Sequence, residues 1–395
     1  MRVPAILRRV LRRCRAEVHL KRFTAVLAVI GGIVDGGRLS LTAIGRSLSR
    51  RGSPKHDIKR VDRLLSNRKM RRELRLYFRD VAGFVVGGWA RPVVLLDWTK
   101  VTDDFHALVA AVPIGGRAVT IYEEVHPERH LGSARVQAAF LRALADVLPR
   151  GCRPIIVTDA GFHGPFFRAV LRRGWDYVGR IRGTATMQLT SSRTSMTGAQ
   201  AYASASSVPR DLGTAVLYAT RRSMDARLVL AAKPRRRRKH PWSGHHRTGE
   251  GGVARSTITG AKEPWLLATS LDAQTAAQIV AIYATRMQIE ETFRDAKNHR
   301  FGWSLRHVRG YHADRLTLLL LFGALATLAV VLLGLAAAEA GWHRRYQANT
   351  VKTRTLSFFV LGVALLQRRD LKGLGDVLRL ARLHFQTVGK ALGTQ

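Results

Sequence analysis

The sequence predicts a mixed α/β fold with helical regions at both ends of the chain, and three observations predict it. Residues 1–90 are basic and rich in helix-forming side chains. From residue 91 onward, short runs of branched apolar residues alternate with amphipathic segments, which is typical of a sheet covered by helices on both faces. Residues 184–263 are rich in Ser, Thr, Gly and Ala with short alternating runs, which indicates a β-rich insertion.

The chain has 395 residues, enough for two or three domains, and it is strongly basic. Lys and Arg number 66 against 27 Asp and Glu, a formal net charge of +39. This excess predicts a polyanionic partner, with nucleic acid favoured over an anionic membrane surface. Cys14 and Cys152 lie far apart, so neither a disulfide framework nor a zinc finger is indicated. A reducing cytoplasm fits this cysteine usage.

Residues 1–90 are predicted to form a helical, DNA-binding region. The first residues, "MRVPAILRRVLRRCR", indicate a basic amphipathic helix without the features of a signal peptide. Further on, Ser40 is expected to cap one helix and Ser53 to precede a second. We predict a helix-turn-helix whose second helix contacts DNA; an ordinary helical hairpin with a charged outer face is the alternative. The candidate DNA-binding residues of the second helix are Lys55, Lys59 and Arg60.

Residues 91–183 and 264–340 are predicted to form the central sheet and its helices. "RPVVLLDWTKV" is a strand whose apolar run ends at Asp97, and "RPIIVTDAGF" is one whose apolar run ends at Asp159. Gly115-Gly116 joins two further strands as a hairpin. Because ligands gather at strand ends in such sheets, we expect both carboxylates at one edge. A strand-end cap is the structural alternative for either Asp alone.

Residues 283–297, "YATRMQIEETFRDAK", are predicted to form one amphipathic helix. At about 100° per residue, Tyr283, Arg286, Glu290 and Lys297 fall within roughly 60° of one another. Taken alone, this face is equally compatible with a solvated surface held by ion pairs such as Arg286 with Glu290.

Glu290 adds a third carboxylate to the two at the strand ends. Clustered carboxylates raise one another's pKa values, and divalent cations stabilise such a cluster. Oxygen-only ligands favour Mg²⁺ or Mn²⁺, and two such ions about 4 Å apart support in-line phosphoryl transfer. Tyr283, Arg286 and Lys297 are then candidate phosphate ligands beside the metals.

The sequence resembles the DDE transposases of bacterial insertion sequences, in the group with the Tyr-(2)-Arg-(3)-Glu-(6)-Lys signature. That signature stands at residues 283, 286, 290 and 297 with every gap correct. "VVLLDWT" and "IIVTDAGF" are similar to the first and second acidic motifs of the family. The resemblance runs from about residue 40 to 340. Ala160 departs from the pattern, because an Arg is common there in relatives, and this removes one phosphate contact while the triad stays whole.

The resemblance implies a ribonuclease H-like catalytic core, interrupted by the insertion, that cleaves and joins DNA with metal ions. Asp97, Asp159 and Glu290 would be the catalytic triad. They would bind two Mg²⁺ or Mn²⁺ ions as cofactors. Tyr283, Arg286 and Lys297 would contact DNA phosphates near the cleaved end. Trp265 matches an aromatic residue that in some members stacks on a flipped base; a core or strand-edge tryptophan is the alternative.

The uncharged stretch from Leu316 to Ala338 is long enough to span a bilayer. It is also typical of a fully buried central helix, which is the favoured interpretation, and the resemblance strengthens it because the helix after the signature packs in the protein interior in this family. We therefore predict no membrane role.

The histidines of "KHPWSGHH" (His240, His245 and His246) could bind zinc, but this interpretation is weaker than that of a basic loop that contacts DNA.

The predicted function is cut-and-paste transposition by a homodimer on paired ends of double-stranded DNA, comprising terminal inverted repeats and target DNA. Residues 341–395 are predicted to be helical and are a candidate dimerisation region. The expected location is the bacterial cytoplasm, with the nucleoid. The alternatives are a nuclease without transposition and a non-catalytic DNA-binding protein of the same fold.

Overall fold

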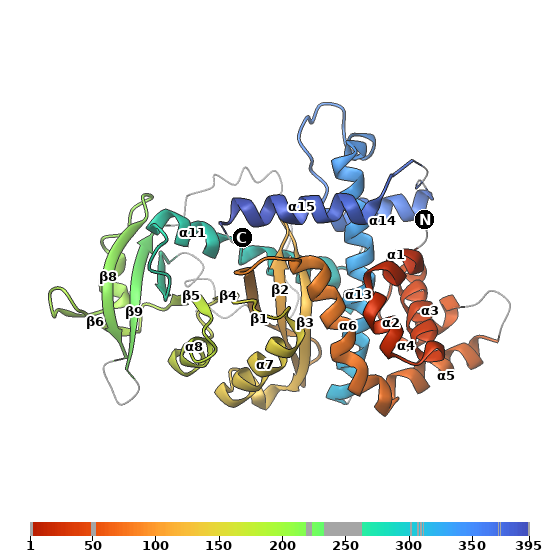
Figure 1. The fold of residues 1–395 in the computed structure, drawn as a ribbon, viewed down its shortest axis with the longest axis horizontal. Coiled ribbons are helices and arrows are strands. Elements are labelled where there is room, and N and C mark those ends of the chain that lie inside the picture. Colours follow the sequence, from red (N-terminus) through yellow and green to blue (C-terminus); the bar gives the residue numbers. More distant parts are fainter. Residues whose placement is uncertain are drawn as a thin grey trace, which may run out of the picture. The chain divides into compact units, whose positions relative to one another are not determined.

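The computed structural model forms two compact units, Met1–Ile155 with Thr285–Gln395 (unit 1) and Ile156–Ala284 (unit 2). Figure 1 labels the elements of both units. The domain boundaries predicted from composition stay predictions. The structure describes residues 3–48, 53–218, 223–232, 263–300, 302–305, 308, 310, 312–369, 371 and 373–393.

Unit 1 begins with helices, as the sequence predicts. Ser40 Oγ accepts a hydrogen bond from the N–H of Ala43 at 3.4 Å, and Ser53 precedes a helix that starts at a proline. The helices that contain Gly45 and Ile58 approach each other closely: a Cβ atom on Gly45 would lie 2.6 Å from Ile58. The helices are α1 (Val3–Val10), α2 (Arg12–Glu17), α3 (Leu20–Gly36), α4 (Leu41–Leu48), α5 (Pro54–Leu65) and α6 (Arg68–Val86).

Three antiparallel strands follow in unit 1, namely β1 (Val93–Lys100), β2 (Phe105–Pro113) and β3 (Ala118–Pro127), with β2 in the middle. The predicted hairpin is confirmed, with Gly115 at φ 89° and Gly116 at φ 95°, which glycine adopts readily. Asp97 lies inside β1, so the prediction that it ends its strand is wrong. Trp98 and Thr99, which follow it, favour extended backbone and continue the ladder.

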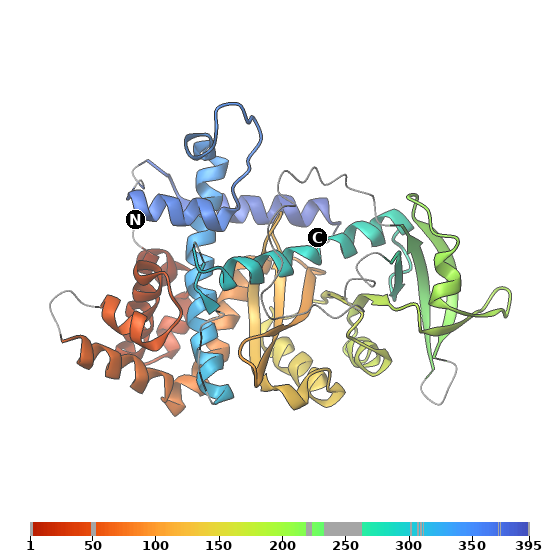
Figure 2. The same cartoon turned by 180° about the vertical axis from the view of Figure 1, so that it is seen from behind.

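Helices cover both faces of these strands. On one face, Tyr122 packs against Phe78 of α6 and Phe140 of α7 (Ala134–Val147). The other face carries α12 (Met287–Lys297), which Figure 2 shows crossing the strands. Asp97 pairs with Val109, and Val109 pairs with Glu123. Because directly opposed residues share a face of the sheet, Asp97 and Glu123 both project towards α12.

The long apolar segment forms α13 (Ala313–Glu339), and it is the one described helix long and apolar enough to cross a membrane by length and composition. Of its most apolar window, 89% is buried inside the protein. It contacts β3, whose Val125 N–H donates to Thr317 Oγ1 at 3.1 Å. It also packs on the C-terminal helices. These elements are η3 (Trp342–Tyr346), α14 (Phe358–Arg368) and α15 (Val377–Ala391).

Unit 2 contains a second antiparallel sheet region, in the order β5-β10-β9-β8-β6-β7. The strands of the predicted insertion join it where β9 pairs with β10. The 233–262 stretch, which includes the three histidines, lies outside the described residues. The elements are β4 (Ile155–Thr158), α8 (Gly164–Leu171), β5 (Asp176–Ile181), β6 (Thr186–Leu189), β7 (Ser195–Thr197), α9 (Gly198–Tyr202), β8 (Arg210–Leu217), β9 (Met224–Ala231), β10 (Trp265–Thr269) and α11 (Ala276–Ala284).

Candidate active site

The predicted helix over residues 283–297 is two helices, so the prediction of one continuous helix is wrong. The α11 helix ends at Ala284 and α12 begins at Met287, with a turn at Thr285 and Arg286. Arg286 keeps helical dihedral angles, φ −54° and ψ −34°. The turn contains neither glycine nor proline, the usual signals of a break. Neither the residue types at the turn nor the helical spacing of the side chains therefore indicates that the helix breaks here.

Arg286 bridges Asp97 and Glu290, the two predicted acids that lie in unit 1. Its Nη1 atom lies 3.4 Å from Asp97 Oδ2, and its Nη2 atom lies 2.5 Å from Glu290 Oε1. The side chains of Arg286 and Asp97 are only 13% and 14% exposed. Glu290 stands in the first turn of α12, where the helix dipole favours a negative charge. One guanidinium thus holds together two carboxylates that come from distant parts of the chain.

The main chain and the next turn of α12 complete this face. The N–H of Trp98 donates to Asp97 Oδ1 at 2.8 Å, which fixes the carboxylate plane. Lys297 Nζ donates to Thr99 Oγ1 at 2.7 Å and lies 5.9 Å from the centre of the Phe293 ring. Arg286, Glu290 and Lys297 therefore all face β1.

Tyr283 and Trp265 form a pair of their own in unit 2. Their rings lie 5.0 Å apart in an edge-to-face arrangement. Tyr283 is 3% exposed and Trp265 is half-buried. Tyr283 belongs to α11, so the structure separates it from the helix that carries the rest of the signature.

Asp159 follows β4 directly in unit 2, at the strand end where the sequence predicts it. Its Oδ1 atom accepts a hydrogen bond from the N–H of Gly161 at 2.9 Å. This is an Asx-type turn, the local geometry of a capping aspartate. The turn holds one carboxylate oxygen and gives the half-buried side chain a fixed direction.

The donor set in unit 1 suits a hard cation. Asp97 and Glu290 offer carboxylate oxygens, which Mg²⁺ and Mn²⁺ prefer, and both already face one positive charge on Arg286. Within the ranges that the structure describes, no three His, Cys, Asp or Glu side chains form a ready-made metal cluster. The two acids fit part of an oxygen-ligand metal site.

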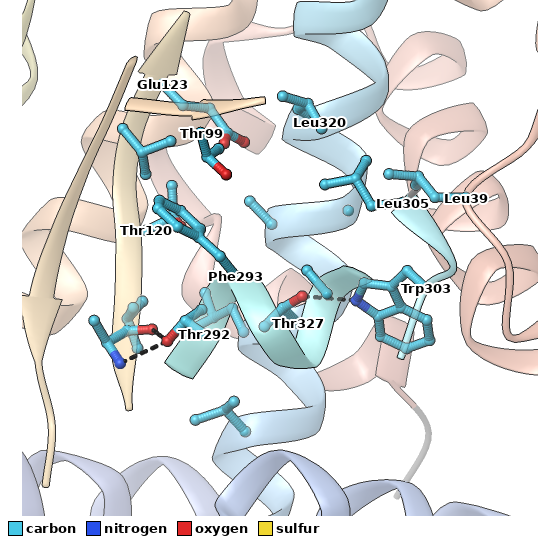
Figure 3. A pocket seen from close by; sticks show the side chains of 18 residues that line it. Leu39, Thr99, Thr120, Glu123, Thr292, Phe293, Trp303, Leu305, Leu320 and Thr327 are labelled. Carbon is cyan, nitrogen blue, oxygen red and sulfur yellow. Dashed lines mark hydrogen bonds between the residues drawn. The ribbon is translucent and has the colours of Figure 1, made fainter. Parts of the chain in front are cut away.

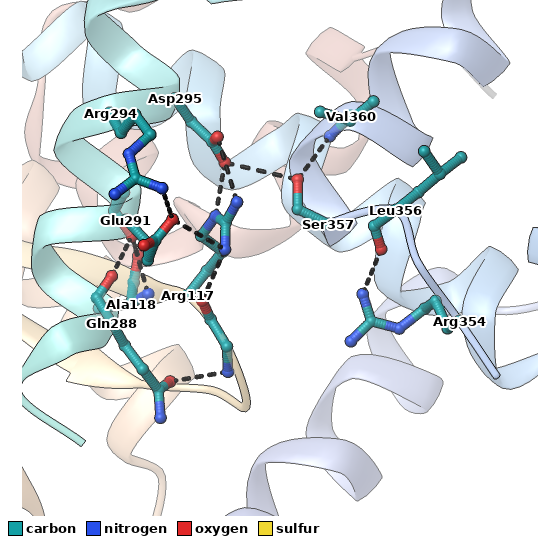
Figure 4. Close-up of polar contacts among 12 residues, drawn as sticks. Arg117, Ala118, Gln288, Glu291, Arg294, Asp295, Arg354, Leu356, Ser357 and Val360 are labelled. Atoms are coloured by element: carbon teal, nitrogen blue, oxygen red, sulfur yellow. Dashed lines mark hydrogen bonds and ion pairs between the residues drawn. The ribbon is translucent and has the colours of Figure 1, made fainter. Parts of the chain in front are cut away.

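A second face of α12 fixes the helix to the β2–β3 hairpin, and Figure 4 shows Gln288 and Asp295 of α12 beside Arg117 and Ala118 of the hairpin. Gln288 Oε1 accepts hydrogen bonds from three successive N–H groups at the hairpin tip, those of Ile114, Gly115 and Gly116, at 3.0–3.1 Å. Thr292 Oγ1 accepts from the N–H of Ala118 at 2.9 Å. These contacts orient the turn of α12 that carries Glu290.

The same face continues to Asp295, which is buried and pairs with Arg117 at 2.7 Å. Ser357, which caps α14, donates a hydrogen bond to Asp295 Oδ2 at 3.4 Å. Residues 288, 292 and 295 have the spacing of one helical face. That spacing is visible in the sequence, but the hairpin that it binds is more than 170 residues away, so local pattern could not identify the contact.

The family resemblance implies DNA cleavage with Glu290 as a catalytic residue. On that basis Gln288→Ala is expected to lower the cleavage rate by about 10- to 100-fold, because a small displacement of a catalytic group has an effect of that size. Single-turnover cleavage measures it. Gln200→Ala is the matched control, since Gln200 Oε1 also accepts a hydrogen bond from a main-chain N–H, that of Thr197 at 2.7 Å, and Gln200 is exposed. Equal rates for the two variants would show that the hairpin contact does not position α12.

The second helix of the predicted helix-turn-helix, α5, has one buried face and one exposed basic face. Its buried residues are Asp57, Val61, Leu64 and Leu65, and Arg315 of α13 pairs with Asp62 at 2.5 Å. Lys55, Lys59 and Arg60 are exposed. The basic side chains are therefore available to a polyanion, as the DNA-binding prediction requires.

Residues 89–327 match the family of the transposase DDE domain. The chain belongs to this family. No curated protein matches the chain. The matched region contains Asp97, Asp159 and Glu290. Membership in the DDE transposase family indicates a transposase with DNA as its partner, and the mixed α/β architecture is consistent with a ribonuclease H-like core.

Proposed function

We propose that this DDE transposase is a cut-and-paste enzyme of a bacterial insertion sequence, of the Tyr-(2)-Arg-(3)-Glu-(6)-Lys group. It would cleave DNA at the element ends and join the freed 3′ ends to target DNA. The observation that carries the proposal is the bridge from Arg286 to Asp97 and Glu290. It supports a shared site for acids from the first acidic motif and the signature.

Asp97, Glu290 and Asp159 are proposed to hold two Mg²⁺ or Mn²⁺ ions. When bound, such ions supply an activated water or 3′-hydroxyl nucleophile and stabilise the leaving oxygen in an in-line displacement. Arg286 already contacts both acids of unit 1, so it can stay between metal-bound carboxylates and a DNA phosphate. Its contacts orient the acids before DNA arrives.

The remaining side chains are proposed to hold DNA. Lys297 would contact a phosphate from its position beside Thr99, and Tyr283 another. Trp265 would stack on a flipped base, for which its half-buried ring is suited. Lys55, Lys59 and Arg60 of α5 would contact the terminal repeat.

The proposed enzyme acts as a homodimer on paired ends, in the bacterial cytoplasm and at the nucleoid. Residues 341–395 are the proposed dimerisation region. The net charge of +39 supports many phosphate contacts, which makes binding fall steeply with salt concentration.

The test is strand cleavage of a labelled duplex that carries the terminal repeat of the element, with Mg²⁺, by the wild type and by Asp97→Ala. We expect metal-dependent cutting at the repeat boundary by the wild type only. Cutting without strand transfer would instead indicate a nuclease. Binding without cutting in both Mg²⁺ and Mn²⁺ would indicate a non-catalytic DNA-binding protein and would overturn the proposal.

A further inference from the structure

Glu123 of β3 is a buried carboxyl group that the proposed function does not use. Its side chain projects from the same sheet face as Asp97, and the residue is 6% exposed. Among the described residues, its Oε1 atom has no hydrogen-bond partner. Burial raises the pKa of Glu123 to about 8, because a charge without a partner is unfavourable away from water. At neutral pH it is therefore mainly a neutral acid, able both to donate and to accept a hydrogen bond.

Glu123 lines a cavity of about 60 Å³ between the sheet, α12 and α13, and Figure 3 shows its carboxyl group beside Thr99. One water needs roughly 10–15 Å³ of such space and two or more polar partners. The other walls are mainly apolar, including Phe293, Leu320 and Val331. The cavity has room for more than one water, and Glu123 and Thr99 are polar groups that such waters can bridge.

Thr99 connects this cavity to the signature helix. Its Oγ1 atom accepts a hydrogen bond from Lys297 Nζ at 2.7 Å. A hydroxyl group that accepts a hydrogen bond still has its own hydrogen to donate. Two other hydroxyl groups of the lining already have partners, since Thr327 Oγ1 accepts from Trp303 and Thr292 Oγ1 accepts from the N–H of Ala118.

We propose that ordered water in this cavity links the neutral carboxyl group of Glu123 to the hydroxyl group of Thr99, and that Glu123 thereby acts as a positioning residue for Lys297. The Thr99 hydroxyl donates to water, and water donates to the carbonyl oxygen of Glu123. This arrangement directs the lone pairs of Thr99 towards the ammonium group. The role assigned to Lys297 rests on the proposed function, whereas the water link to Thr99 does not.

The first test compares Glu123→Met with Glu123→Gln. Methionine has the same length without a strong hydrogen-bonding group, and glutamine keeps both an acceptor and donors. We expect Glu123→Met to lower cleavage about tenfold without lowering the melting temperature, and Glu123→Gln to restore most of that loss. Combined with Lys297→Ala, Glu123→Met should cause little further loss, because groups that act through one another are not additive. Fully additive losses, or a fully active Glu123→Met, would overturn the proposal.

The second test does not depend on cleavage. Among the residues that the structure describes, Glu123 is the only titratable side chain that lines the cavity. Asp97 lies two strands away on the same face, and Lys297 contacts Thr99. The folded protein holds the Glu123 proton more tightly than the unfolded chain does. Stability is therefore fully present below the ordinary pKa of 4.5 and falls as pH rises towards about 8.

Melting curves from pH 4 to 9 should show this fall in the wild type relative to Glu123→Gln, which cannot ionise. The difference between the two should level off above pH 8. Parallel curves would overturn the neutral-acid arrangement. If this difference is present and the wild type does not cut DNA, the proposed function fails but the neutral, buried state of Glu123 is supported. The double variant Glu123→Met with Lys297→Ala is then compared with the single variants by their binding to the repeat duplex. Additive binding losses there would overturn the link to Lys297.

Discussion

Glu290→Gln is expected to lower strand cleavage by at least about 10³-fold while the affinity for terminal-repeat DNA stays within about threefold. The amide oxygen can still accept a hydrogen bond from Arg286, so the first turn of α12 should keep its structure. It carries no negative charge, however, and binds a divalent cation weakly. The loss should therefore appear in the chemical step, measured by single-turnover cleavage beside a binding titration at the same salt concentration.

Glu291→Gln is the matched control on the same helix. Glu291 pairs with Arg294, whose side chain is 70% exposed, at 2.8 Å and with Arg117 at 3.8 Å. The amide oxygen of glutamine can still accept hydrogen bonds from these guanidinium groups. We expect its cleavage rate to stay within about threefold of the wild type. Melting curves of both variants check folding. Persistent cleavage by Glu290→Gln in a folded protein would remove Glu290 from the proposed catalytic triad.

The elements that could be predicted are those whose signal is local. The strand at Val93–Lys100, the glycine hairpin, the helix capped by Ser40 and the helix that follows Ser53 with a proline all follow from neighbouring residues. The contact of Arg286 with Glu290 was likewise one of the ion pairs that helical spacing offers. Its second contact, with Asp97, joins distant parts of the chain. The prediction joined these two acids as ligands of a shared metal site, and the family resemblance supported it, because no local pattern pairs residues so far apart.

What could not be predicted depends on tertiary contacts. The turn at Thr285 and Arg286 contains no breaker residue, so periodicity runs through it. In the sequence, Gln288 looks like an ordinary polar residue of a helix. Its role depends on the hairpin tip, whose N–H groups donate to it only in the folded structure. In "YEEV", strand alternation sends Glu123 and Glu124 to opposite faces. Sequence pattern assigns one of them to solvent, whereas the helices on both faces leave Glu123 buried.

Gly334→Ala is expected to destabilise unit 1 by about 3 kcal/mol or more, because it overpacks a helix crossing that has no space for a methyl group. A Cβ atom on Gly334 of α13 would lie 1.8 Å from the carbonyl oxygen of Phe358, and one on Gly362 of α14 would lie 2.0 Å from that of Val330. Backbone occupies both positions, so no side-chain rotation relieves the clash. The two helices must separate, which exposes apolar surface along α13.

The effect should reach the active site, because Ser357 at the start of α14 donates to Asp295 of α12. Denaturant unfolding measures the loss of stability, and cleavage below the unfolding transition measures the displacement of α12. Gly83→Ala in α6 is the matched control, since nothing lies within 4 Å of a Cβ atom there; it should stabilise the helix by about 1 kcal/mol. Equal unfolding midpoints for Gly334→Ala and the wild type would mean that α13 and α14 cross with more room than this contact allows. A loss of stability without any change in cleavage would mean that α14 does not hold α12 through Ser357.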